Sequence, residues 1–224
     1  MTSTPAHEFD DSPADARHLG LRVLRREHEG VLIYFERRAD VKFIVESGGG
    51  SAGGLVMPVE PGFAKAGQGQ SVEMVLFCPS ESDWSLQISL QVTEIDRPES
   101  EECVDRWIGY HGPTTQTTWI RCAIDGGKTE TAVFGPEEIV APNALGRAEY
   151  PLIKKANADR NRLAAACKAH AAIIVADPQC VGVDPLGLDI KARFGIIRLE
   201  FALGLYADTP DLASREIERM LGRP

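Results

Sequence analysis

The sequence lacks an excess of basic residues, and it lacks long apolar runs. Lysine and arginine number 24 against 33 aspartates and glutamates, which gives a net charge of −9. Nucleic acids are bound mainly by neutralising their phosphates with basic side chains, so nucleic acid is disfavoured as a partner. No stretch approaches the roughly 20 apolar residues that cross a bilayer, and the N-terminal stretch carries acidic residues where a signal peptide carries basic ones. We therefore expect a cytoplasmic protein with no membrane partner.

Cysteine and histidine are also scarce, and neither is spaced as a metal site. The five cysteines are odd in number and widely separated, without a CxxC pair, which is typical of reduced thiols rather than disulfides or zinc ligands. No two of the five histidines lie four residues apart, so a paired-histidine metal site on a helix is not expected. These patterns assign no catalytic residue, and whether the chain is an enzyme stays open.

The first part of the chain predicts a sheet with few helices. A Ser-Pro-Ala-Asp start predicts a helix over 13–28. Short β-branched and aromatic runs then predict strands over 31–35, 41–45, 55–57, 74–78, 86–92, 119–124 and 129–134, with a turn at 36–40. A second, amphipathic helix is expected from 99 to a stop at Gly109 or Gly112. Leu86, Ile88, Leu90 and Val92 alternate with polar residues, so they are expected to face a core. The glycine-rich run 48–53 is followed by a strand pattern and not by a helix, so it predicts a flexible connection and not a phosphate loop. This number of short strands favours a small barrel or sandwich.

The second part of the chain differs in charge and in pattern. Residues 149–224 carry a net charge of +1, and the preceding residues carry −10. A proline-rich segment over 136–151 separates the two parts. After it we expect a helix over 152–170, extended segments at 172–176 and 181–184, a hairpin over 187–201, and a final helix that begins after Thr209. Asp184 and Asp189 are expected to cap a turn, because their surroundings lack the oxygen density of a calcium loop.

His111 is the best-placed histidine for binding a ligand. It ends the predicted helix that carries Trp107, in the sequence Trp-Ile-Gly-Tyr-His-Gly. Aromatic neighbours could flank a flat ligand, and a neutral imidazole can ligate a metal or a haem iron. The alternative is a structural histidine that is hydrogen-bonded at a helix end.

The second part carries motifs that resemble a known family. They are Asn157-Ala158-Asp159-Arg160 on the helix, Asp184-x-x-Gly187-Leu188-Asp189 in the turn, and Arg198-x-x-Phe201 on the following strand. These motifs resemble those of the C-terminal α+β domain of the haem-utilisation proteins. In that family the domain follows a split barrel of the pyridoxamine 5'-phosphate oxidase type, also called FMN-binding-like. The hairpin 119–135, ending Val133-Phe134-Gly135, is similar to the closing hairpin of that barrel. Two departures are that Arg160 stands where the family has histidine and that Val133 replaces the first glycine of Gly-Phe-Gly.

The resemblance implies an α+β protein with an N-terminal split β-barrel, peripheral helices and a small C-terminal α+β domain. The expected organisation is a disordered N-terminus over 1–12, the split-barrel domain over 13–140, a linker over 141–151 and the C-terminal domain over 152–224. Split barrels of this family pair two subunits face to face, so a homodimer is the implied assembly.

Two functional hypotheses follow from the resemblance. The first is a protein that binds haem or FMN, with a redox step as an option. His111 is then the candidate haem ligand and metal ligand, while Arg37, Arg38 and Lys42 are the candidate partners of a flavin phosphate. The second is a non-catalytic binding or regulatory member of the fold that has lost its cofactor site and works through protein contacts. Haem, FMN and no cofactor at all remain open at this point, as do a small planar ligand and a protein as the partner.

Overall fold

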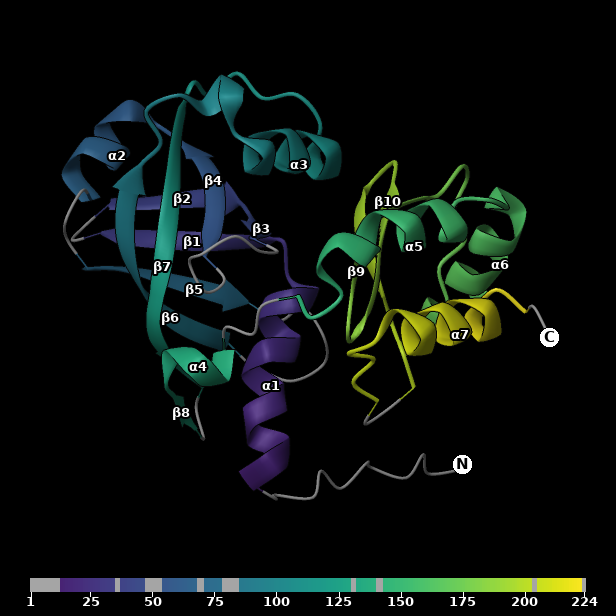
Figure 1. The fold of residues 1–224 in the computed structure, drawn as a ribbon. Coiled ribbons are helices and arrows are strands. Elements are labelled where there is room, and N and C mark those ends of the chain that lie inside the picture. Colours follow the sequence, from purple (N-terminus) through teal and green to yellow (C-terminus); the bar gives the residue numbers. More distant parts are fainter. Residues whose placement is uncertain are drawn as a thin grey trace, which may run out of the picture.

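A computed structural model describes residues 13–34, 37–46, 54–67, 71–77, 85–129, 132–139, 143–202 and 205–222. The predicted disordered N-terminus and the glycine-rich run 48–53 lie outside these residues. Figure 1 shows a large sheet on one side of the molecule and a smaller sheet with three helices on the other. The α+β class expected from the sequence is confirmed.

The large sheet is antiparallel, with the order β2-β1-β5-β6-β7-β4-β3, and β8 pairs with β7. Its strands are β1 (Glu29–Tyr34), β2 (Arg37–Lys42), β3 (Ile44–Val45), β4 (Leu55–Val59), β5 (Ser71–Phe77), β6 (Ser85–Glu94), β7 (Thr118–Lys128) and β8 (Val133–Phe134). The outermost strands β2 and β3 are not paired with each other, so the described ladder does not close into a barrel.

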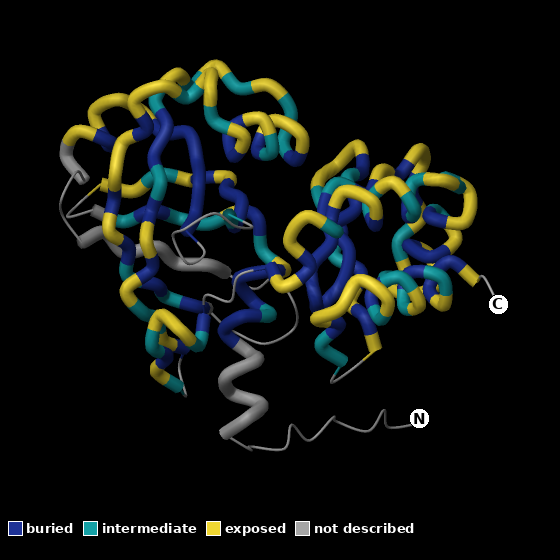
Figure 2. Tube along the Cα trace, in the orientation of Figure 1, coloured by how far each residue is buried: buried dark blue, intermediate teal, exposed yellow. Residues whose placement is uncertain are grey.

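β6 shows why the sequence pattern forms a sheet over a core. Leu86, Ile88, Leu90 and Val92 are buried, as their alternation predicts, because successive side chains of a strand point to opposite faces. They join residues of β4 and β7 in one apolar cluster. β4 is buried along its whole length and appears dark blue in Figure 2.

Helices pack against the large sheet, most of them at its central strands β6 and β7. They are α1 (Pro13–Arg26), α2 (Pro61–Gly67), the 3-10 turn η1 (Pro98–Ser100), α3 (Glu102–His111) and α4 (Pro136–Ile139). Trp107 on α3 packs edge-on against Trp119 of β7, with 5.2 Å between the ring centroids, and its indole Nε1 donates to the Lys42 carbonyl at 2.8 Å. These contacts fix α3 on the sheet near β3 and β4.

The C-terminal part has its own apolar core. Its elements are η2 (Gly146–Ala148), α5 (Glu149–Ala156), α6 (Arg160–Ala171), β9 (Gln179–Asp184), β10 (Gly187–Ala192), β11 (Gly195–Glu200) and α7 (Pro210–Met220). The three strands form an antiparallel sheet in the order β11-β10-β9, and one buried cluster joins this sheet to α5, α6 and α7. Val181 and Ile196 of this sheet also pack against the cluster that contains Trp107 and Trp119, so the two parts share an apolar contact.

Several sequence predictions need correction. The helix expected over 152–170 is two helices, because Asp159 caps α6 by accepting from the amides of Asn161 and Arg162. That side chain offers the backbone an alternative to helical hydrogen bonding. The extended segment at 172–176 is not a strand. The linker expected up to residue 151 already contains η2 and the start of α5.

Three further differences concern the first part. Most of the expected turn at 36–40 belongs to β2, in register with β1. The strand expected over 129–134 is limited, within the described residues, to Val133 and Phe134. The short helix α2 was not expected, because seven residues with two glycines give a weak helical signal.

The described cysteines are reduced thiols, as the sequence predicts. Cys103, Cys122, Cys167 and Cys180 are free and buried, and Cys78 lies outside the described residues. Burial raises the pKa of the Cys122 thiol to about 12, which keeps it protonated and inert. In the part of the chain that the structure describes, no helix has the length and apolar character needed to cross a bilayer.

Candidate functional site

His111 lies at the C-terminal end of α3, in contact with Trp107. The two ring centroids are 4.7 Å apart, and His111 Nε2 lies 3.0 Å from the carbonyl oxygen of Phe43. A carbonyl oxygen only accepts hydrogen bonds, so Nε2 carries the hydrogen and the neutral ring keeps its lone pair on Nδ1. The hydrogen-bonded helix-end histidine, one of the two alternatives from the sequence, is therefore present.

The charge state of His111 is set by its surroundings. Burial lowers the pKa of His111 to about 4, and the hydrogen bond to Phe43 only partly offsets this effect. The imidazole is therefore neutral near pH 7. A neutral imidazole whose other nitrogen donates to a backbone carbonyl is the arrangement that metal-ligating histidines usually show. The contact with Phe43 is thus compatible with ligation through Nδ1.

The structure does not bring Arg37, Arg38 and Lys42 together. All three are exposed on β2, where neighbouring side chains alternate between the two faces of the sheet. Arg37 lies on the face opposite to Arg38 and Lys42. Arg37 and Lys42 occupy the two ends of β2, and Lys42 pairs with Glu29 at 3.1 Å. These three residues of one chain do not face a common phosphate.

Other potential metal ligands are dispersed. Among the described residues, no three His, Cys, Asp or Glu side chains are grouped so that they could hold a metal ion. Arg160, which stands where the resembled family has histidine, pairs with Asp177 and donates to the Pro178 carbonyl. It therefore makes a local contact within the C-terminal part.

A buried polar cluster between the two parts was not predicted. Its centre is Arg198 on β11, which pairs with Asp184 at 2.5 Å and with Asp189 at 2.9 Å. All three side chains are less than 10% exposed. Asp184 also accepts from the Leu186 amide at 2.8 Å, so its predicted role as a turn cap is confirmed. For Asp189 that prediction is wrong, because its carboxylate faces the other part of the chain.

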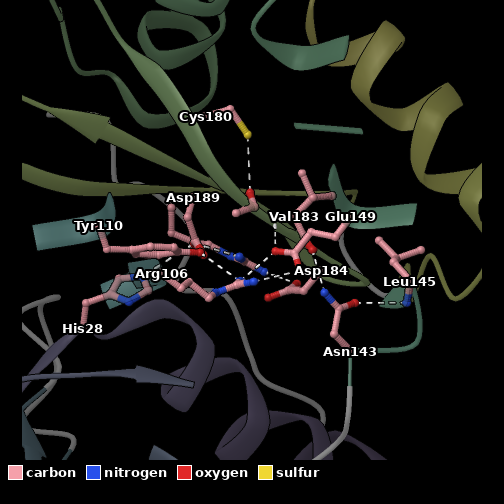
Figure 3. Close-up of polar contacts among 12 residues, drawn as sticks. His28, Arg106, Tyr110, Asn143, Leu145, Glu149, Cys180, Val183, Asp184 and Asp189 are labelled. Carbon is pink, nitrogen blue, oxygen red and sulfur yellow. Dashed lines mark hydrogen bonds and ion pairs between the residues drawn. The ribbon is translucent and has the colours of Figure 1, made fainter. Parts of the chain in front are cut away.

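Residues of the first part reach Asp189 across the junction (Figure 3). The Tyr110 hydroxyl on α3 donates to Asp189 Oδ2 at 2.8 Å, and His28 Nε2 lies 3.5 Å from Asp189 Oδ1. Arg106 lies one turn before Tyr110 on α3. Both of its terminal nitrogens donate hydrogen bonds to the Glu149 carboxylate of α5. We call the seven residues joined in this way the junction cluster: His28, Arg106, Tyr110, Glu149, Asp184, Asp189 and Arg198.

Gly182 on β9 makes the Tyr110 contact possible. A Cβ atom at this position would overlap the Tyr110 hydroxyl and lie 2.9 Å from Asp189 Oδ2. A glycine inside a strand often marks such a close approach. Together with the Asp-x-x-Gly-Leu-Asp motif, it was the one sequence signal that could have located the cluster.

Electrostatics keeps Asp189 and Arg198 of the junction cluster ionised. Burial alone would raise the pKa of Asp189, but Arg198 and His28 hold it well below its usual range. Burial likewise disfavours the charged form of Arg198, and the two aspartates outweigh this, so the pKa of Arg198 is raised. The pKa of Tyr110 is raised by burial and by the Asp189 charge, so its hydroxyl remains a donor. Three residues of the motifs that carry the resemblance, Asp184, Asp189 and Arg198, therefore belong to a buried contact between the two parts.

Comparisons with known proteins support the fold alone. No protein-family model matches this chain, and no curated protein sequence is similar to it. A protein of unknown function from Agrobacterium tumefaciens has a similar structure, with a TM-score of 0.73 and 14% sequence identity over 97% of this chain and 100% of that one. A haem-binding protein from Mycobacterium smegmatis aligns with a TM-score of 0.40 and 14% identity over 91% of this chain and 96% of that one.

Proposed function

We propose that this chain is a haem-binding protein of the split-barrel type, in which His111 would bind the haem iron. The observation that carries the proposal is the neutral imidazole of His111, whose Nε2 is hydrogen-bonded to Phe43 beside the Trp107 ring. Nδ1 is the nitrogen that would bind iron. The bound haem would supply redox or ligand-binding chemistry, and the chain's own contribution is to orient the imidazole and hold it neutral.

The sequence supports the same proposal through its resemblance to the haem-utilisation proteins. The motif residues Asp184, Asp189 and Arg198 meet in one buried cluster of this chain, which supports a structural role for the motifs that carry the resemblance. FMN receives no comparable support, because Arg37, Arg38 and Lys42 do not converge. We therefore restrict the proposal to haem.

A haemin titration tests the proposal. The wild-type protein is expected to develop a Soret band that is retained through gel filtration. The His111→Ala variant is expected to bind haemin at least about tenfold more weakly, because it lacks the ligating nitrogen. His170→Ala is the matched control, since His170 is exposed at the end of α6, and it should bind haemin as the wild type does.

The pH dependence adds a second readout. Because burial lowers the pKa of His111 to about 4, haemin affinity is expected to be constant above about pH 5 and to fall as the imidazole protonates near pH 4. Equal affinity of the His111→Ala and wild-type proteins would contradict the assignment. A featureless spectrum after gel filtration would instead favour the non-catalytic, regulatory alternative.

The homodimer implied by the resemblance is a separate prediction. Light scattering coupled to gel filtration is expected to give a mass of about twice the 24.4 kDa of one chain. The measurement should be made without haemin and again with it. A mass of one chain under both conditions would contradict the proposed pairing of split barrels.

A further inference from the structure

A small cavity lies inside the junction cluster, between the two parts of the chain. It is lined by Arg25 at the end of α1, His28, Arg106, Tyr110, Asp184 and Asp189, together with apolar residues of β3 and β9. Its volume is about 10 Å³, close to the space that one water-sized molecule needs. His111, the proposed haem ligand, is not among the lining residues, so the cavity is a different site from the proposed haem site.

Two side chains of the cavity wall carry buried nitrogen atoms without a hydrogen-bond partner among the described residues. They are Nδ1 and Nε2 of His28 and Nε of Arg106. His28 is only 9% exposed. Its Nε2 is within ion-pair distance of Asp189 Oδ1, but 3.5 Å is too long for a good hydrogen bond. Buried donors that stay unpaired are costly, so these atoms favour an occupant that accepts hydrogen bonds.

The carboxylates around the cavity are already engaged. Arg198 donates to both Asp184 and Asp189, and Tyr110 donates to Asp189. Glu149 accepts hydrogen bonds from both terminal nitrogens of Arg106. Asp184 and Asp189 also line the cavity, so the groups that favour an anion there are the unpaired nitrogens of His28 and Arg106. A cation would also lie against the guanidinium groups of Arg25 and Arg106, which line the wall, and would be repelled by them.

We propose that this cavity binds a small monovalent anion of about the size of chloride. The Nε–H of Arg106 and one N–H of the His28 ring donate to it. A hydrogen bond from a charged guanidinium to an anion is among the stronger kinds in proteins. The anion would link α3 to the segment after α1 at the point where both face the C-terminal sheet.

Bromide provides a direct test in the wild-type chain. Crystals grown without halide and soaked in sodium bromide are expected to show an anomalous difference peak within hydrogen-bonding distance of Arg106 Nε and His28. A peak absent from the cavity, with ordinary water density in its place, would overturn the proposal. Haem plays no part in this measurement, so its result is independent of the proposed haem binding.

Thermal unfolding tests the site in solution. At equal ionic strength the wild type is expected to melt about 2 to 4 °C higher in sodium chloride than in sodium gluconate, whose anion is too large for the cavity. The His28→Phe variant keeps an aromatic ring but has no nitrogen, so the chloride effect should vanish. His170→Phe, at an exposed position, should retain it. A chloride effect that persists in His28→Phe, or that is missing from the wild type, would contradict the site. If the His28→Phe variant does not fold, the bromide peak in the wild type still shows whether the cavity binds an anion.

Discussion

Replacing Gly182 with alanine is expected to destabilise the protein by about 2 to 6 kcal/mol. The new Cβ would overlap the Tyr110 hydroxyl and crowd Asp189 Oδ2 at 2.9 Å. Tyr110 is only 4% exposed and cannot turn toward solvent without breaking its hydrogen bond to Asp189. The expected loss combines about 1 to 3 kcal/mol for overpacking with a similar cost for a buried group left unpaired. Urea unfolding of the two proteins measures the difference.

A control and a double variant separate this mechanism from a general effect of alanine. Gly109 on α3 is exposed, and nothing lies within 4 Å of a Cβ added there. Gly109→Ala is therefore expected to be neutral or to stabilise the protein by up to about 1 kcal/mol. Tyr110→Phe removes the overlapping hydroxyl, so Gly182→Ala should cost less in that background than in the wild type. Equal costs in both backgrounds would show that the Tyr110 contact is not the cause.

Replacing Arg198 with methionine is expected to destabilise the protein by about 3 to 5 kcal/mol at pH 7. Arg198 is the shared partner of Asp184 and Asp189, and all three side chains are buried. Methionine fills part of the volume but leaves the aspartates without that partner, and breaking a buried ion pair from one side costs this much. Arg162→Met is the matched control, because the pair Arg162–Asp159 is exposed. Loss of this exposed ion pair should lower the free energy of unfolding by less than about 1 kcal/mol.

The pH dependence of the Arg198→Met effect identifies its electrostatic origin. In the wild type, burial works against ionised Asp189, but Arg198 and His28 outweigh it and lower its pKa below the ordinary 3.8. The stabilisation from this group is therefore complete above about pH 4 and declines as the pH falls below that value. Without Arg198, burial acts to raise the pKa of Asp189, and protonation relieves its unpaired charge. The difference in unfolding free energy between variant and wild type is thus expected to shrink as the pH falls from 7 toward 4. A difference that stays constant over this range would contradict the buried-charge explanation.

Both variants bear on how the two parts of the chain are held together. Tyr110 and His28 come from the first part, and Asp189 and Arg198 come from the second. An apolar contact through Val181 and Ile196 accompanies them. The junction cluster therefore orients the two parts of the chain relative to each other in addition to stabilising the fold. Its hydrogen bonds form only when α3 lies in one position against β9 and β10.

The candidate ligand His111 could be selected from the sequence because the signals were local. A helix pattern, its end at Gly112 and the nearby Trp107 all lie within a few residues. What the sequence could not supply was the partner of the ring, since Phe43 is 68 residues away. The basic residues Arg37, Arg38 and Lys42 were chosen for their place on an early strand. Their separation became visible only when residues 37–42 proved to be a strand in register with β1.

By itself the sequence determined the α+β class, the buried face of β6, and the start of α7 at its Thr209 cap, because strand and helix periodicity and capping are properties of neighbouring residues. The break between α5 and α6 also follows from a local cap, Asp159, whereas the tertiary structure alone decided the assembly of the junction cluster. Tyr110 and Asp189 are 79 residues apart, and no local pattern specifies which buried donor meets which carboxylate. That choice depends on how two sheets and their helices pack, and the packing brings the ends of distant elements to a single point.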